Sequence, residues 1–251
     1  MNLDLAGKHA IVTGSTDGVG RAMVRALMQQ GVLVAAIYEQ ESAASASLQA
    51  ELEQYGNGSF ALPADVSDAQ SVATMLERVR EQFGQVDILV NNASIINHAP
   101  FQELALPAWQ RVLDINLTGV YLVSQAVLAL MTNGGSIINV SACLAAVGMR
   151  GKAHYTAAKA GVIGLTRSLC KEVGYQGVRV NVIAPGVIET EEIGDLSPEQ
   201  RKRYAYLAAI GRLGQPDEVA AVVLFLASNL SSFITGATIA IDGGVGGIGA
   251  F

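Results

Sequence analysis

Tyr155 and Lys159 carry acid–base chemistry and stand four positions apart in a stretch, His154 to Val173, that is predicted to be helical. This spacing places both side chains on one face of the helix. A free tyrosine titrates at about 10, and a neighbouring ammonium group favours the phenolate and lowers that pKa. A tyrosine tuned in this way can donate a proton to a carbonyl oxygen or accept one from an alcohol. Taken alone, such a pair is far more often two ordinary side chains on a solvated helix face.

A glycine-rich turn, T-G-S-T-D-G-V-G at 13–20, joins an apolar strand at 9–14 to a helix predicted from Val19 to Gln30. Glycines at these places let the backbone turn tightly and approach a pyrophosphate. The N-terminus of the following helix presents N–H groups and the positive end of its dipole. A glycine-rich loop without a ligand is the alternative. The position between the first strand and the first helix favours nucleotide binding.

Short apolar runs alternate with helical segments along the whole chain. Strands are predicted at 9–14, 32–38, 59–66, 86–94, 136–142, 178–186 and 237–244. Helices are predicted at 19–30, 42–55, 69–83, 154–173 and 216–227, with two more within 106–131. Continuous apolar strands separated by helices indicate parallel pairing with both sheet faces covered. The sequence therefore predicts an α/β fold, one doubly wound sheet formed by a single domain, 1–251. The polar, helical segment at 188–211 interrupts the alternation and is predicted to be a lid over the ligand crevice.

The composition excludes several classes of protein. The 251 residues carry a formal charge of −6, with 51% hydrophobic and 15% charged residues, which is typical of a globular chain. An acidic balance gives no general attraction for nucleic acid or anionic membranes. The longest wholly apolar stretch, Val219 to Ala227, is nine residues, whereas a membrane-spanning helix needs about 20. Two cysteines, Cys143 and Cys170, give neither a disulfide framework nor a metal-ligand cluster. The N-terminus lacks the features of a secretion signal, and we expect a cytoplasmic protein.

The glycine-rich turn, read as T-G-x-x-x-G-x-G, resembles the classical short-chain dehydrogenase/reductase family. Further motifs follow in the family's order over nearly the entire chain: Asp65-Val66, N-N-A-S at 91–94, D-I-N-L-T-G around Asn116, Tyr155-x-x-x-Lys159, P-G-V-I-E-T at 185–190, G-R-L-G at 211–214 and D-G-G at 242–244. Ser94 stands where the family has glycine. The resemblance implies a Rossmann fold and NAD(P)-dependent interconversion of a ketone and a secondary alcohol. It extends equally to ketoacyl-carrier-protein reductases and to sugar or polyol dehydrogenases, so the substrate stays open.

The resemblance also assigns roles to residues of this chain. Tyr155 is the acid/base, Lys159 also holds the nicotinamide ribose, and Asn116 anchors a water that relays protons from Lys159. The residues expected to contact the cofactor are Gly14, Thr16, Asp17, Gly18, Val19, Gly20, Glu39, Asp65, Val66, Asn92, Ala93, Ser94, Tyr155, Lys159, Pro185, Gly186, Ile188 and Thr190.

One position departs from the family pattern at the catalytic centre. The family places a substrate-orienting serine thirteen residues before the tyrosine, where this chain has Ala142, and the serine here is Ser141. A shift of one residue in a strand sends a side chain to the opposite face. Three interpretations are open. The strand end is bent so that Ser141 or a water replaces the hydroxyl, the chain is an engineered variant of low activity, or the protein binds nucleotide with lost or altered chemistry. Ser141 is carried forward as a candidate catalytic residue.

The end of the second strand bears on the choice of cofactor. By resemblance, NAD-preferring relatives have Asp at the position of Tyr38. NADP-preferring relatives have basic residues at the positions of Glu39 and Asp17, and this chain has neither signature. The carboxylates of Glu39 and Asp17 disfavour a 2′-phosphate because like charges repel. We therefore predict NAD rather than NADP; the alternative is that the Glu39 side chain points to solvent.

The substrate pocket and the assembly are less defined by the sequence. His98, Met149, Arg150 and His154 are candidate pocket residues by their proximity to the motifs. The helix at 154–173 carries small residues that permit close helix packing, and in the family this helix lies in a dimer interface. The resemblance thus implies a homodimer or homotetramer. The apolar C-terminal stretch from Val245 to Phe251 is a second candidate subunit contact.

Overall fold

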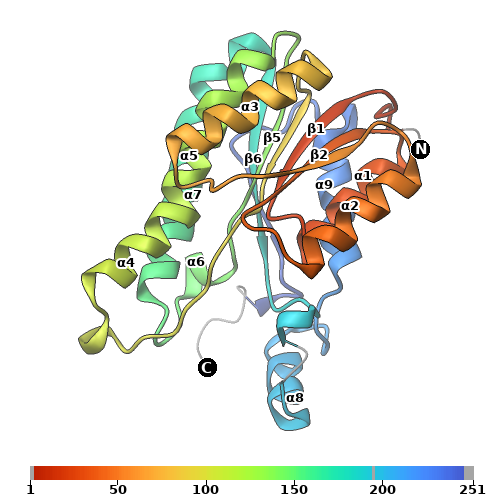
Figure 1. The fold of residues 1–251 in the computed structure, drawn as a ribbon. Helices are drawn as coiled ribbons and strands as arrows, with labels where there is room; N and C mark the ends of the chain where they lie inside the picture. The colour runs from red at the N-terminus through yellow and green to blue at the C-terminus, as the bar shows by residue number, and fades with distance from the viewer. Residues whose placement is uncertain (1–2, 194–195, 246–251) are drawn as a thin grey trace.

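Seven parallel strands form the sheet that the strand–helix alternation predicts (Figure 1). The computed structural model describes residues 3–193 and 196–245. The strands are β1 (His9–Thr13), β2 (Leu33–Tyr38), β3 (Phe60–Pro63), β4 (Ile88–Asn91), β5 (Gly135–Val140), β6 (Val178–Pro185) and β7 (Thr238–Ile241). Their order is β3-β2-β1-β4-β5-β6-β7, so the chain reverses its direction across the sheet between β1 and β4. A ligand crevice is expected at the carboxyl ends of the strands at this point.

Helices cover both faces of the sheet (Figure 1). The helices are α1 (Gly18–Gln29), α2 (Ala43–Tyr55), α3 (Ala69–Phe83), α4 (Leu106–Leu113), α5 (Gly119–Val127), α6 (Leu144–Val147), α7 (Ala153–Val173), α8 (Pro198–Leu207) and α9 (Pro216–Ala227). One core joins α1, α2 and α9 to the sheet, and a second joins α3, α5 and α7 to its other face. Successive residues of β1 divide between the two cores: Val12 packs in the first and Ile11 in the second. This two-sided burial explains the continuous apolar strands.

Local signals account for where several helices begin and end. Ser42 and Ser45 form a reciprocal capping box at the start of α2, and Gly56 ends that helix in the left-handed conformation. Gly31, the predicted stop after α1, has a φ of 76°. The polar segment predicted to be helical forms α8, which extends away from the sheet beyond the carboxyl ends of the strands (Figure 1).

The segment predicted as two helices within 106–131 contains an irregularity that the sequence pattern does not reveal. A π-helical stretch, Asp114–Thr118, separates α4 from α5, and a 3₁₀ turn, Leu128–Leu130, follows. The one-turn helix α6 after β5 was also not predicted. π-Helical segments are frequent at functional sites, and this one carries Asn116.

The run Leu106–Leu130 is the one helical segment of the described residues that is long and apolar enough to cross a membrane, with a mean hydropathy of 1.5. Of its most apolar stretch, 44% is buried inside the fold, where Val123 and Val127 pack in the core behind the sheet. Core helices pass the same test of length and composition, so hydropathy alone assigns no membrane role to this segment.

Candidate active site

A cleft of about 990 Å³ lies at the carboxyl ends of the strands and brings the predicted motifs together. Every residue that the sequence predicts to contact the cofactor lines this cleft, as do Ser141 and Ala142. Among the predicted catalytic and cofactor-binding residues, Asn116 alone lies outside the lining, since it is fully buried behind the wall. The described residues hold no group of three or more His, Cys, Asp or Glu side chains arranged to bind a metal ion.

The glycine-rich turn is tight enough that only glycine fits at two of its positions. A Cβ on Gly20 would lie 1.9 Å from the Gly14 carbonyl oxygen, and one on Gly14 would lie 2.8 Å from the Ala93 Cα. Gly14 also has a φ of +65°, which favours glycine. The turn thus presents bare backbone to the cleft and leads directly into α1. Backbone of this kind at a helix N-terminus is suited to a phosphate group.

The segment after β4 is fastened to the glycine-rich turn by hydrogen bonds. The Thr13 hydroxyl accepts from the backbone N–H groups of Asn92 and Ala93, each at 3.0 Å. The Asn92 side-chain amide donates to the carbonyls of Thr13 at 3.1 Å and Gly14 at 2.8 Å. The N-N-A-S motif therefore acts as a brace that fixes the floor of the cleft.

Tyr155 and Lys159 lie together in the cleft wall on α7, as their spacing predicts. The Lys159 Nζ atom is 5.6 Å from the centre of the Tyr155 ring and donates a 2.9 Å hydrogen bond to the Val140 carbonyl. Burial lowers the pKa of Lys159 to about 7. Burial thus makes the neutral amine easier to reach than it is for a solvated lysine.

Ser141 and Ala142 occupy different surroundings at the end of β5. The Ser141 hydroxyl donates a 2.8 Å hydrogen bond to the backbone carbonyl of Lys159, so that it joins the strand end to α7. Ala142 packs in a cluster with Tyr155 and Val112. This arrangement favours Ala142 as the residue at the family's serine position and argues against a direct role for Ser141, whose hydroxyl is engaged elsewhere.

Asn116 braces the catalytic wall through its side chain. Its amide nitrogen donates to the carbonyls of Ile95 and Val112, each at 2.9 Å, and its amide oxygen accepts from the Ser94 hydroxyl at 2.5 Å. Both N–H groups of the side chain are therefore in use. The water relay predicted for Asn116 stays a prediction, and Ser94, the departure from the family's glycine, is a direct partner of this brace.

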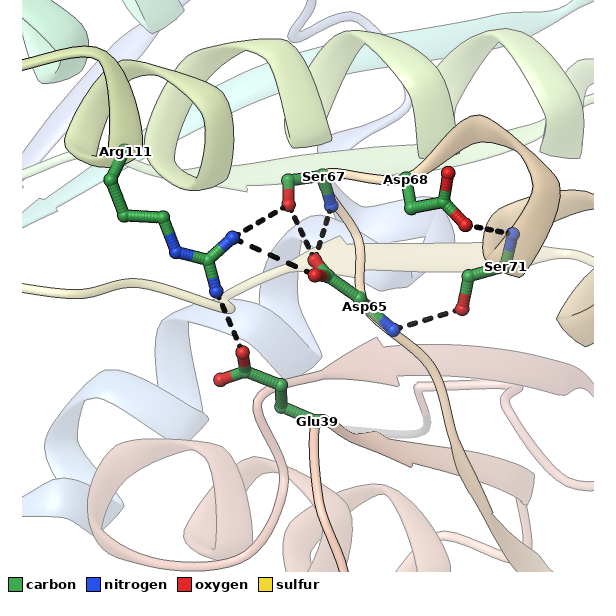
Figure 2. A network of polar contacts seen from close by, with 6 residues as sticks. All are labelled: Glu39, Asp65, Ser67, Asp68, Ser71 and Arg111. Carbon is green, nitrogen blue, oxygen red and sulfur yellow. Dashed lines mark hydrogen bonds and ion pairs between the residues drawn. The ribbon is translucent and has the colours of Figure 1, made fainter. Parts of the chain in front are cut away.

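A polar network at the β2–β3 end of the cleft includes a residue that the sequence analysis missed (Figure 2). Arg111, in the last turn of α4, donates to the Glu39 carboxylate at 2.8 Å and to the Ser67 hydroxyl at 3.0 Å. Its guanidinium also lies 3.6 Å from the Asp65 carboxylate. Burial would raise the pKa of Asp65, but hydrogen bonds from the Ser67 hydroxyl and amide, together with Arg111, hold that pKa below its ordinary value. No motif marks Arg111; only the proximity of α4 to the ends of β2 and β3 reveals its role.

Of the four residues proposed for the substrate pocket, only Met149 lines the cleft. His154 is fully buried, and neither of its ring nitrogens has a hydrogen-bond partner among the described residues. Burial, followed by the charge of Lys152, lowers the pKa of His154. Apolar side chains packed against the Tyr155 cluster come instead from Ile95 and Leu144. Other large apolar or aromatic residues that line the cleft are Ile96, Met149, Ile193, Leu196 and Tyr204.

Comparisons with known proteins agree with this arrangement. Residues 14–246 match the family model described as "Enoyl-(Acyl carrier protein) reductase". The chain is 39% identical to a 3-oxoacyl-(acyl-carrier-protein) reductase of Synechocystis sp., over 96% of this chain and 98% of the relative. It is likewise 39% identical to the 3-oxoacyl-(acyl-carrier-protein) reductase FabG of Vibrio cholerae, over 97% and 99%. It is 40% identical to cis-4-hydroxycyclohexanecarboxylate dehydrogenase of Sinomonas cyclohexanicum, over 95% and 96%.

These matches and the sheet topology define an α/β oxidoreductase. The chain belongs to the short-chain dehydrogenase/reductase family.

Proposed function

We propose that the protein interconverts a ketone and a secondary alcohol with a nicotinamide dinucleotide, using Tyr155 as the acid/base. The observation that carries this proposal is the position of the buried Tyr155–Lys159 pair in the wall of the cleft that begins at the glycine-rich turn. The cleft thus joins a surface suited to phosphate groups to a surface suited to proton transfer.

The residues present fit the cofactor. Side chains at Gly14 and Gly20 would collide with backbone, so the turn leaves room for a pyrophosphate against its N–H groups. All five of the following residues line the cleft: Asp65 and Val66 would contact the adenine, and Pro185, Gly186 and Thr190 would lie on the nicotinamide side. A bound nicotinamide supplies or accepts the hydride.

Tyr155 moves the proton that accompanies this transfer. In reduction its hydroxyl donates to the substrate oxygen, and in oxidation its phenolate accepts the alcohol proton. A charged Lys159, whose Nζ lies 5.6 Å from the Tyr155 ring centre, stabilises the phenolate. Because the pKa of Lys159 is about 7, the same amine can also take up or release a proton near neutral pH.

The substrate we propose is a ketone or alcohol with apolar substituents. Tyr155 packs with apolar side chains such as Ile95 and Leu144. Ile193, Leu196 and Tyr204 line the same cleft and come from the segment at 188–211, which we propose closes over the substrate as a lid. The names of two relatives describe reduction of 3-oxoacyl groups, and that of a third describes oxidation of a cyclic alcohol. All three transformations interconvert a carbonyl and a secondary alcohol.

A panel of ketones and secondary alcohols, followed at the absorbance band of the reduced nicotinamide, tests the proposal. Turnover that disappears in Tyr155→Phe is the expected result. The second candidate function is nucleotide binding without turnover, which the alanine at position 142 favours. Tight cofactor binding with no turnover on a broad panel would support that candidate instead.

We further propose NAD as the preferred cofactor, because Glu39 and Asp17 line the cleft and carry negative charge where a 2′-phosphate would lie. Fluorescence titration with NADH and NADPH at matched ionic strength checks this preference, and Glu39→Arg should shift it toward NADPH. Tighter binding of NADPH by the unaltered protein would refute it.

We propose a homodimer or homotetramer, built through α7, and a cytoplasmic location. Two small residues of α7 have different surroundings. A Cβ on Gly161 would lie 2.9 Å from a Leu117 side-chain atom of the same chain, whereas one on Gly164 meets nothing within 4 Å. Gly164 therefore leaves open surface for a second subunit. Sedimentation of the intact protein measures the assembly state. The predicted contact by the C-terminal tail lies largely outside the described residues.

A further inference from the structure

Arg111 connects the two halves of the sheet across the β2–β3 end of the cleft (Figure 2). It belongs to α4, which follows β4, whereas Glu39 follows β2 and Asp65 follows β3. The three charged groups contact one another through the 2.8 Å Arg111–Glu39 hydrogen bond and the 3.6 Å ion pair with Asp65. Ser67 completes the network by donating to Asp65 and accepting from Arg111.

Within this network the Asp65 carboxylate accepts more hydrogen bonds than the Glu39 carboxylate. Asp65 accepts from both the hydroxyl and the backbone N–H of Ser67, at 2.5 and 2.8 Å. The only hydrogen bond found for the Glu39 carboxylate in the described residues is the one from Arg111. Glu39 and Arg111 are each 45% exposed in their side chains. Arg111 is therefore positioned by Ser67 and Asp65 even without Glu39, and its second N–H group is directed at whatever anion occupies the place of Glu39.

The charges at this end of the cleft therefore do not all oppose a 2′-phosphate. Glu39 and Asp17 are repulsive, but Arg111 offers the planar donor group that binds phosphate oxygens well. In this protein the Glu39 carboxylate accepts a hydrogen bond from that guanidinium. A phosphate that reached it would displace the carboxylate and leave two anions close together.

We propose that Arg111 is a specificity-determining residue that can bind the 2′-phosphate of NADP. In the unaltered protein its guanidinium is paired with Glu39, so neutralising Glu39 is sufficient for the phosphorylated cofactor to bind. This inference rests on the proposed function, because it takes the cleft to be a dinucleotide site. It goes beyond the preference for NAD, since it names a cationic partner already in place.

The experiment measures binding of two fragments, 5′-AMP and 2′,5′-ADP, by calorimetry, and so requires no turnover. Their affinity ratio isolates the contribution of the 2′-phosphate. Glu39→Gln should improve the ratio in favour of 2′,5′-ADP by about tenfold, the amount expected from one hydrogen bond between charged groups. Adding Arg111→Met should abolish that gain. Arg111→Lys, which keeps the charge and loses the planar donor geometry, should retain part of it.

The exposed pair Arg78–Glu81 on α3 supplies the matched control, because it is also an arginine–glutamate contact, at 3.2 Å, away from the cleft. Glu81→Gln and Arg78→Met should leave the ratio unchanged. A gain that survives in the Glu39→Gln/Arg111→Met double variant, or no gain in Glu39→Gln, overturns the role of Arg111 while nucleotide binding stands. Failure of the unaltered protein to bind either 5′-AMP or NADH overturns the proposed function and this inference together.

Discussion

Replacing Ala142 by serine would restore a hydroxyl next to Tyr155, in the cluster that Ala142 forms with Tyr155 and Val112. Ala142 is 8% exposed and lines the cleft, so the new hydroxyl can turn toward the substrate oxygen without a large cavity or overlap. One preorganised donor to a developing oxyanion contributes about 2.7–4 kcal/mol, or about 10²–10³ in kcat. A hydroxyl that is less well oriented contributes about 1 kcal/mol, the strength of an ordinary hydrogen bond. We therefore expect kcat to rise between about fivefold and a thousandfold in Ala142→Ser.

The assay is steady-state turnover of the best ketone found in the panel, with reduced cofactor at saturation. The gain should vanish in the Tyr155→Phe background, because the added donor assists a proton transfer that needs the tyrosine. Ser141→Ala is the control at the neighbouring position and should change kcat little. The reasoning fails if Ala142→Ser leaves kcat unchanged while Ser141→Ala abolishes turnover, since Ser141 would then be the working hydroxyl.

Three further predictions concern the residues that support this site. Ser141→Ala should lower the free energy of unfolding by about 0.5–1.5 kcal/mol through loss of its hydrogen bond to Lys159. Urea denaturation measures this, and an unchanged midpoint and slope would contradict it. Gly20→Ala should abolish NADH binding in fluorescence titration because its Cβ would lie 1.9 Å from the Gly14 carbonyl oxygen; normal affinity would show that the turn adapts. Lys159→Met tests the lowered pKa. Between pH of about 7 and 10.5 the unfolded chain binds a proton at Lys159 that the folded protein does not, so stability relative to Lys159→Met should rise with pH, by up to about 1.4 kcal/mol per unit. Denaturation of both proteins at pH 7 and 9 measures the difference, and a constant difference would refute the shift.

Much of the fold could be predicted because each element carries its own signal. The apolar runs of β1 and β2 are buried on both faces, which the sequence shows as uninterrupted hydrophobic stretches. Gly31 and Gly56 mark helix ends through their backbone conformation. The π-helical stretch at Asp114–Thr118 has no comparable signal, because its i→i+5 hydrogen bonding covers only five residues, too few to change the apolar pattern of the sequence.

A contact within the candidate site could be predicted where both of its residues belong to the same motif. Tyr155 and Lys159 lie on one helix, so their spacing fixes their proximity. The surroundings of Ser141 and Ala142 depend instead on how the end of β5 meets α7. The count of thirteen residues favours Ala142 as the equivalent of the family's serine, and the hydrogen bond from Ser141 to the Lys159 carbonyl is a physical reason to prefer that assignment, which stays a prediction.

The same distinction explains why the sequence alone gave an incomplete account of charge around the cofactor. Glu39 and Asp17 belong to the glycine-rich half of the sheet and stand at positions where the family's pattern is informative. Arg111 reaches Glu39 from the other half, through an α4 side chain whose contacts depend on the relative placement of the two halves. A 2′-phosphate interacts with all nearby charges, so the negative charge of the residues near the glycine-rich turn does not by itself determine the selectivity between NAD and NADP. If Arg111 binds the 2′-phosphate as proposed, selectivity depends on whether Glu39 or the cofactor accepts the hydrogen bond of its guanidinium, a competition between two anions for one donor.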